Sequence, residues 1–143
     1  MNENGKWERA RDELLHSIER LDEGQKYYII FYNDGWYPMD AEKPIVATAK
    51  HVDMTRRWVG RIWPSGGTFP LQALLKALSL EPDAVYFLSD GRFDPGVIEE
   101  LRVQNPDSTG QIPIHTISFV NQETIGIMRT IAKNSGGKFR FVE

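Results

Sequence analysis

Two short motifs carry the oxygen-bearing side chains that could do chemistry in this chain. Gly66-Gly67-Thr68 precedes an amphipathic segment, and Ser89-Asp90-Gly91 follows an apolar run at residues 84–88. In an α/β fold the loops that follow parallel strands meet at one edge of the sheet, where small sites are usually built. Hydroxyl and carboxylate oxygens are ligands that Mg²⁺ accepts. We therefore weigh Thr68 and Asp90 as two ligands of one metal site; the competing interpretation makes Thr68 a helix N-cap and Asp90 a turn residue.

Other catalytic arrangements find little support in the sequence. The three histidines, His16, His51 and His115, lie far apart and lack the spacing of zinc ligands. The chain has no cysteine, and it contains no G-x-S-x-G elbow, P-loop or dinucleotide fingerprint. His115 alternates with apolar neighbours on a predicted strand, so we interpret it as a core or boundary residue.

The composition is that of one ordinary soluble domain, and we expect it to span residues 1–143. The net charge is −3, and acidic and basic residues are intermixed, so no basic stripe suggests a nucleic-acid partner. No run approaches the roughly 18 apolar residues of a membrane span, and the first thirty residues lack a signal pattern. We expect no membrane insertion by this segment, and the cytoplasm is the default expectation.

Hydrophobic periodicity alternates between helices and strands along the chain. An apolar stripe predicts a first helix over residues 5–21, and residues 36–44 read as a loop. The other predicted helices cover residues 51–62, the segment that Thr68 caps, the segment from Asp94 and the segment after Asn121. The predicted strands are residues 26–32, 45–47, 84–88, 114–120 and 138–142. Strand–helix alternation with apolar strands predicts an α/β fold with a mostly parallel sheet flanked by helices.

Three segments, taken in order, resemble the von Willebrand factor type A (vWA) domain. They are GGTFPLQALLKAL from Gly66, AVYFLSDG from Ala84 and IAKNSGGKFRFV from Ile131. The resemblance implies a Rossmann-like sheet and a metal-ion-dependent adhesion site, in which Thr68 and Asp90 match two of the ligand positions. The family's Asp-x-Ser-x-Ser loop has no counterpart in this sequence. The resemblance thus implies a chain that begins just after that loop and lacks the central first strand.

The absent loop and strand have two expected consequences. Thr68 and Asp90 alone supply two of the roughly six oxygens that Mg²⁺ prefers, so this half-site would hold Mg²⁺ only at about millimolar affinity unless the loop is supplied. In the family fold the first strand lies between the strands matched by residues 27–32 and 84–88. We expect these two strands to pair directly, to admit a foreign strand, or to drive self-association, because unpaired buried amides are costly.

The residue pattern and the resemblance together favour a protein-interaction module without catalysis. Candidate partner-binding residues surround the predicted half-site: Gly67, Ser89, Arg92 and Trp36. Trp36 either contacts a partner or folds over the sheet edge. An alternative function is a magnesium-dependent phosphatase or hydrolase that uses Asp90, for which Asp94 and Lys76 are the available second carboxylate and lysine. A third interpretation is a folded remnant without a ligand.

Overall fold

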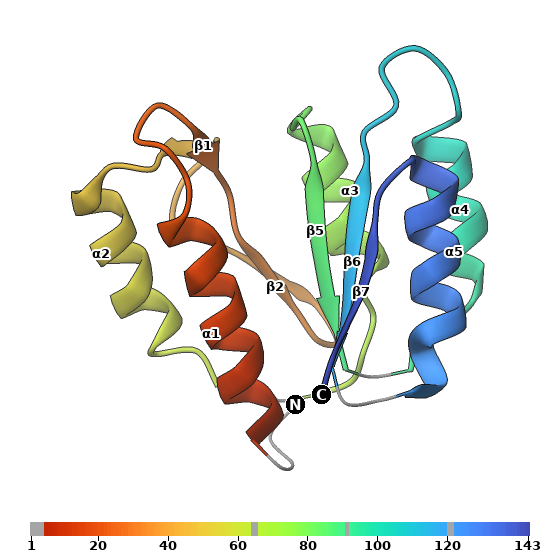
Figure 1. Ribbon diagram of the computed structural model, residues 1–143, viewed down its shortest axis with the longest axis horizontal. Helices are drawn as coiled ribbons and strands as arrows, with labels where there is room; N and C mark the ends of the chain where they lie inside the picture. Colours follow the sequence, from red (N-terminus) through yellow and green to blue (C-terminus); the bar gives the residue numbers. More distant parts are fainter. Residues whose placement is uncertain (1–4, 64–65, 91, 120–121) are drawn as a thin grey trace.

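The structure is a computed structural model, which describes residues 5–63, 66–90, 92–119 and 122–143 (Figure 1). The α-helices are α1 (Lys6–Glu19), α2 (Ala49–Val59), α3 (Leu71–Ser79), α4 (Gly96–Gln104) and α5 (Ile125–Ser135), the last preceded by a 3₁₀ turn at Gln122–Thr124. The strands are β1 (Lys26–Tyr27), β2 (Ile30–Tyr32), β3 (Trp36–Pro38), β4 (Ile45–Val46), β5 (Val85–Ser89), β6 (Ile114–Phe119) and β7 (Phe139–Val142). Within these residues no helix is long and apolar enough to cross a membrane.

A three-stranded parallel sheet forms the C-terminal half of the fold. Its order is β5-β6-β7, with Val85 opposite Ile114 and Thr116 opposite Phe139. The central strand β6 is buried along nearly its whole length, as expected for a parallel strand covered on both faces. The last strand lies at the sheet edge, as its alternation of charged and apolar residues predicts.

The strand predicted over residues 26–32 is divided between two antiparallel ladders. β1 pairs with β4, which confirms the short strand expected near residues 45–47, and β2 pairs with β3. The prediction that residues 36–44 form a loop is therefore wrong at its start, because residues 36–38 form β3. The three residues of β3 are all exposed, so the strand carries no alternating burial signal that a sequence could reveal.

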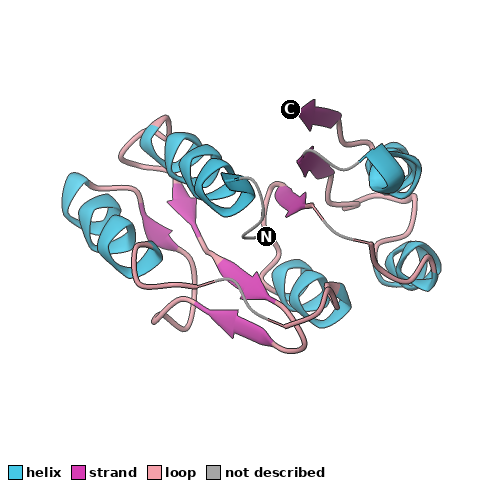
Figure 2. Cartoon of the chain, turned by 90° about the horizontal axis from the view of Figure 1, so that it is seen from below, coloured by secondary structure: helices cyan, strands magenta, loops and turns pink. Residues whose placement is uncertain are grey.

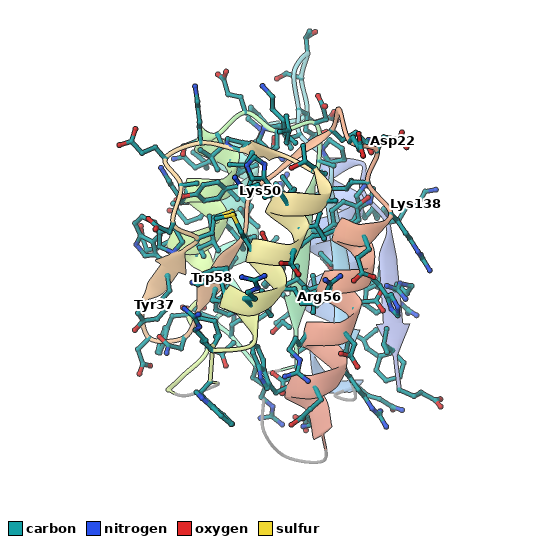
Figure 3. The ribbon with its side chains drawn as sticks, turned by 90° about the vertical axis from the view of Figure 1, so that its left-hand side faces the viewer. Asp22, Tyr37, Lys50, Arg56, Trp58 and Lys138 are labelled. Carbon is teal, nitrogen blue, oxygen red and sulfur yellow. The ribbon has the colours of Figure 1, made fainter. Side chains whose placement is uncertain are left out.

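Helices cover both faces of the strands (Figure 2). α1 and α2 lie on one face, where their apolar residues surround Tyr27 and Ile29, and Ala10 of α1 packs on Ile117 and Phe119. Figure 3 shows α2 beside α1, with Arg56 of α2 near α1, where it pairs with Glu19. On the other face, α3, α4 and α5 enclose the largest core cluster together with β5 and β6. The α/β prediction with a parallel sheet flanked by helices is confirmed.

Of the three outcomes expected for the strands of residues 27–32 and 84–88, direct pairing is not found among the described residues. Within the described residues, β2 forms a ladder with β3 and β5 forms one with β6, and no ladder joins β2 to β5. The Tyr32 side chain provides the connection instead. The Tyr32 hydroxyl donates a hydrogen bond to the Leu88 carbonyl at 3.1 Å, and the Tyr32 and Phe87 ring centroids lie 5.9 Å apart.

Four of the predicted helix starts need comment. Pro70, not Thr68, is the N-cap residue of α3, because the Leu74 amide donates to the Pro70 carbonyl at 2.9 Å and proline's fixed φ suits the helix start. Asp94 lies at the start of α4 as predicted, and its Oδ1 accepts a hydrogen bond from the Gly96 amide at 2.9 Å. Asn4 and Asn121, which directly precede the first and the last predicted helices and are their candidate N-caps, lie outside the described residues.

Candidate functional site

The candidate site lies where β2 and β5 end and where α1 begins (Figure 1). We call this end of the sheet, at Tyr32 and Ser89, the carboxyl edge. β2 is followed by a tight turn in which the Asn33 amide donates to the Gly35 carbonyl at 2.9 Å. The Asn33 side chain accepts a hydrogen bond from the Gly35 amide at 3.0 Å. Asparagine and glycine suit such a turn, and they place the Asp34 carboxylate at its exposed tip.

The Asp34 carboxylate holds the glycine pair of the next loop. Its Oδ1 accepts a hydrogen bond from the Gly67 amide at 2.9 Å. A Cβ atom on Gly66 would lie 2.7 Å from Asp34 Oδ2, and one on Gly67 would lie 2.6 Å from Asp34 Oδ1. Gly66 also has a φ of +79°, which L side chains rarely adopt. The Gly-Gly pair is therefore explained by close packing against this carboxylate.

Thr68 lies between this contact and α3, half-buried in the loop. On its other side the Phe69 amide donates a hydrogen bond to the Asn33 carbonyl at 3.0 Å. The loop that carries Thr68 is thus fastened to the β2–β3 turn by one backbone-to-carboxylate and one backbone-to-backbone hydrogen bond. These two bonds fix the loop's position beside the carboxyl edge.

Ser89 and Asp90 end the neighbouring strand. Ser89 is fully buried, and Asp90 is half-buried. Burial raises the pKa of the Tyr32 hydroxyl well above its ordinary value, the hydrogen bond with Ser89 opposes this shift, and the negative charge of Asp90 adds to it. The hydrogen bond from the Tyr32 hydroxyl to the Leu88 carbonyl, at 3.1 Å, holds the ends of β2 and β5 next to each other. The structure thus brings Tyr32, Ser89 and Asp90 together.

Arg92 connects the loops that follow β5 and β6. Its guanidinium makes two contacts with the Glu123 carboxylate, and both side chains are largely exposed. The hydrogen bond from Arg92 lowers the pKa of Glu123, and the same bond raises the pKa of Arg92. Arg92 therefore presents a paired charge at the surface.

Exposed aromatic side chains border the β2–β3 turn. Trp36 and Tyr37 on β3 are 41% and 53% exposed, and Phe69 is 64% exposed. The Phe69 ring lies over Gly67, since a Cβ atom there would be 2.8 Å from its Cε2 atom. We call Trp36, Tyr37 and Phe69 the aromatic rim; Tyr37 lies at the outer side of the molecule in Figure 3. Trp63, in the loop leading to Gly66, is 77% exposed.

The described residues do not fit a complete magnesium site. They contain no group of three or more Asp, Glu, His or Cys side chains that could hold a metal ion. The Asp34 carboxylate, which lies in the adjacent turn, already accepts the Gly67 amide. Mg²⁺ requires about six oxygens in octahedral geometry, and Thr68 with Asp90 falls far short of that number. The suggestion that these two residues are ligands stays a prediction.

Sequence reasoning missed three residues of the carboxyl edge: Asp34, Tyr32 and Phe69. Asp34 follows the predicted strand at residues 26–32, and an aspartate at a turn tip is a natural partner for the amides of a glycine pair. Tyr32 belonged to an apolar run, and nothing in that run indicates that its hydroxyl reaches Leu88. Phe69 gave no signal apart from its position beside Thr68.

Comparison with known proteins supports the vWA resemblance. No family model matches the chain. The human protein named von Willebrand factor A domain-containing protein 3A is 32% identical over 87 residues, which cover 58% of this chain and 7% of that protein. A solved structure described as von Willebrand factor type A from Catenulispora acidiphila matches 98% of the chain with a TM-score of 0.83 and 18% identity, and 35% of its own length is covered. Proximal thread matrix protein 1 from the mussel byssus matches 98% of the chain with a TM-score of 0.63 and 13% identity, over 37% of its own length.

Proposed function

We propose that this chain, which has the fold of a von Willebrand factor type A domain, is a protein-interaction module that binds its partner at the carboxyl edge. The observation that carries this proposal is the aromatic rim, three large rings exposed beside a loop that hydrogen bonds hold in place. Tryptophan, tyrosine and phenylalanine are enriched at the cores of protein interfaces. Exposed rings of this kind lose water on binding, and a few such residues supply most of the binding energy.

The loops of the carboxyl edge support binding because they are fixed before the partner arrives. Asp34 holds Gly67, and the Asn33 carbonyl holds the Phe69 amide. A surface fixed in this way has less conformational entropy to lose on association. Arg92 and Glu123 offer paired charges beside it, and charges at an interface rim contribute more to the association rate and to specificity than to affinity.

The predicted partner-binding residues differ in how a partner could reach them. Trp36, Arg92 and Gly67 are exposed and available for direct contact. Ser89 is fully buried beneath the edge, so we assign it a supporting role through its hydrogen bond with Tyr32. The chain covers only a small part of its human relative, and the activity and partners of a longer protein would be further proposals.

The alternative, a magnesium-dependent hydrolase, is not favoured by the positions of its candidate residues. Asp94 accepts a hydrogen bond from the first turn of α4. Lys76 lies in the last turn of α3, whereas the first turn of that helix is the one next to Thr68. A phosphate bound beside Thr68, at the start of α3, would therefore not contact Lys76 near the end of that helix.

Alanine substitutions of the aromatic rim test the proposal. The Trp36→Ala/Phe69→Ala double variant and wild type are immobilised, and the proteins retained from a lysate of the source cells are quantified. The matched control is Val103→Ala, which truncates a 63% exposed apolar side chain near the end of α4. We expect the rim variant to lose at least about tenfold in specific capture, equivalent to about 1.4 kcal/mol, while the control matches wild type. Equal capture by all three proteins would refute the proposal.

A further inference from the structure

Asp34 is an exposed carboxylate without a cationic partner among the described residues. It lies at the tip of the β2–β3 turn, and its Oδ1 atom accepts the Gly67 amide at 2.9 Å. No described lysine or arginine side chain forms an ion pair with it, whereas Arg57, Arg92 and Arg140 each pair with another carboxylate. A carboxylate can accept about four hydrogen bonds, so Asp34 retains acceptor capacity for a further donor.

The ring of Phe69 lies beside this carboxylate. A Cβ atom on Gly67 would lie 2.6 Å from Asp34 Oδ1 and 2.8 Å from Phe69 Cε2, so the carboxylate and the ring border the same small space. The face of an aromatic ring attracts a cation that lies within about 6 Å of the ring centroid. A cation that pairs with Asp34 can therefore also contact Phe69.

The chain around the turn has an acidic balance. Residues 33–43 contain Asp34, Asp40 and Glu42 against one basic residue, Lys43. Asp40 and Glu42 are exposed, as Asp34 is. The charge of Arg92 at the same end of the sheet is already paired with Glu123. This part of the carboxyl edge is therefore complementary to a positively charged group.

A side chain of another protein fits this arrangement better than a metal ion does. The described residues contain no group of three or more Asp, Glu, His or Cys side chains that could hold a metal. Between the two cationic side chains, arginine suits the space better than lysine. Its planar guanidinium stacks on an aromatic ring and offers a fork of donors to a carboxylate, whereas the lysine ammonium is a compact and strongly hydrated charge.

We propose that the partner contacts the aromatic rim with an arginine side chain, whose guanidinium pairs with Asp34 and lies against Phe69. This inference rests on the proposed function, because it names the chemistry of the partner bound there. Asp34 then has two roles: it fixes the Gly67 loop and it binds the guanidinium. Arginine is enriched at protein interfaces and among the residues that supply most of the binding energy.

A blocked arginine, N-acetyl-arginine methylamide, is the probe for this site. The corresponding citrulline compound is the control, because citrulline has nearly the same shape without the charge. The full chain is labelled with ¹⁵N, and each compound is added up to about 50 mM at low and constant ionic strength, since salt screens exposed charge pairs. NMR spectra follow the Gly67 and Phe69 amides and the Trp36 indole N–H.

Two matched variants test the role of the charge. Asp34→Asn removes the charge and keeps a side-chain oxygen that can accept the Gly67 amide. Asp83→Asn removes an exposed charge before β5, at the opposite end of that strand from Ser89. Urea midpoints close to that of wild type establish that both variants are folded.

We expect the arginine compound to shift the three signals of wild type with a dissociation constant of about 10 mM, as one charge-assisted pair and one ring contact allow. Asp34→Asn should raise that constant at least about fivefold, Asp83→Asn should leave it unchanged, and the citrulline compound should give no saturable shift. Equal binding of the two compounds, or equal binding by wild type and Asp34→Asn, would overturn the proposal. Wild-type signals that shift on dilution without any probe would also overturn it, because a second copy would then occupy the rim.

The failure of this inference is distinguishable from the failure of the proposed function. If Trp36→Ala/Phe69→Ala loses specific capture while Asp34→Asn keeps it, the partner binds at the rim without an arginine at Asp34. That result overturns the inference and leaves the protein-interaction function in place. Equal capture by wild type and the rim variant refutes the function itself, whatever the arginine compound does.

Discussion

Replacing Gly137 with alanine should be the most damaging single methyl addition among the described glycines. Gly137 follows the left-handed residue Gly136, which ends α5, and it leads into β7. A Cβ atom on Gly137 would lie 2.1 Å from the Ile114 carbonyl oxygen and 2.5 Å from the Ile114 carbonyl carbon. Both atoms belong to the backbone of β6, so no side-chain rotation can relieve the clash.

The size of the effect follows from the bonds that surround the contact. The Ile114 oxygen is about 1.3 Å closer than the 3.4 Å at which ordinary contact begins. A shift of that size would disturb three hydrogen bonds. The Gly137 amide donates to the Ala132 carbonyl at 2.8 Å, the Thr116 amide to the Lys138 carbonyl at 2.9 Å, and the Ile114 amide to Ser135 Oγ at 2.9 Å. At about 1 kcal/mol for each bond, the loss is about 2–4 kcal/mol. That is a large share of the stability of a typical domain.

Urea denaturation followed by tryptophan fluorescence measures this loss directly. Gly126→Ala is the matched control, because Gly126 lies in the first turn of α5 with nothing within 4 Å of its would-be Cβ. Alanine there should stabilise the protein by about 0.5 kcal/mol through helix propensity. A Gly137→Ala protein as stable as wild type would show that α5, β6 and β7 do not pack as described.

Three further predictions concern the carboxyl edge. Tyr32→Phe removes the donor to the Leu88 carbonyl and should lower the free energy of unfolding by about 1 kcal/mol at neutral pH. The pKa of Tyr32 is raised in the folded state, so its neutral form contributes its full stability below the ordinary tyrosine pKa of 10.0. That stability is lost as the pH rises above this value, and urea midpoints should therefore fall less steeply with pH in the variant than in wild type. Gly67→Ala should lower the free energy of unfolding by about 1 kcal/mol, since the contacts at 2.6 and 2.8 Å are with the movable ends of Asp34 and Phe69. A variant with the urea midpoint of wild type would contradict the close packing of Gly67 against these two side chains. MgCl₂ at about 1 mM should not raise the melting temperature, because the described residues fall short of a six-oxygen site; a rise that Asp90→Ala abolishes would show a stronger site than the one described.

The sequence predicts the layered fold well because burial on both faces leaves a strong signal. The apolar runs at residues 84–88 and 114–120 correspond to β5 and β6, which lie between helical layers. The run at residues 26–32 looks equally continuous, but it changes partners from β4 to β3 along its length. A change of antiparallel partner depends on the path of the chain that returns to pair with the run. No residue within the apolar run indicates where this change occurs.

The candidate site is less predictable because its contacts join residues far apart in the chain. Thr68 and Asp90 could be proposed from motifs that end or precede regular elements. The Asp34 contact with Gly67 spans 33 residues, and the Tyr32 contact with Leu88 spans 56 residues. Neither contact leaves a local pattern, since each depends on how two loops meet at the carboxyl edge.

Site-specific photo-crosslinking tests the central claim, that a protein binds at the aromatic rim, most directly. A benzophenone amino acid replaces Phe69 in one protein and Val103 in another, and both side chains are similarly exposed in wild type, at 64% and 63%. On irradiation in a lysate of the source cells, we predict a discrete crosslinked protein from position 69 and none from position 103. No specific product from position 69, or the same product from both positions, would contradict the claim.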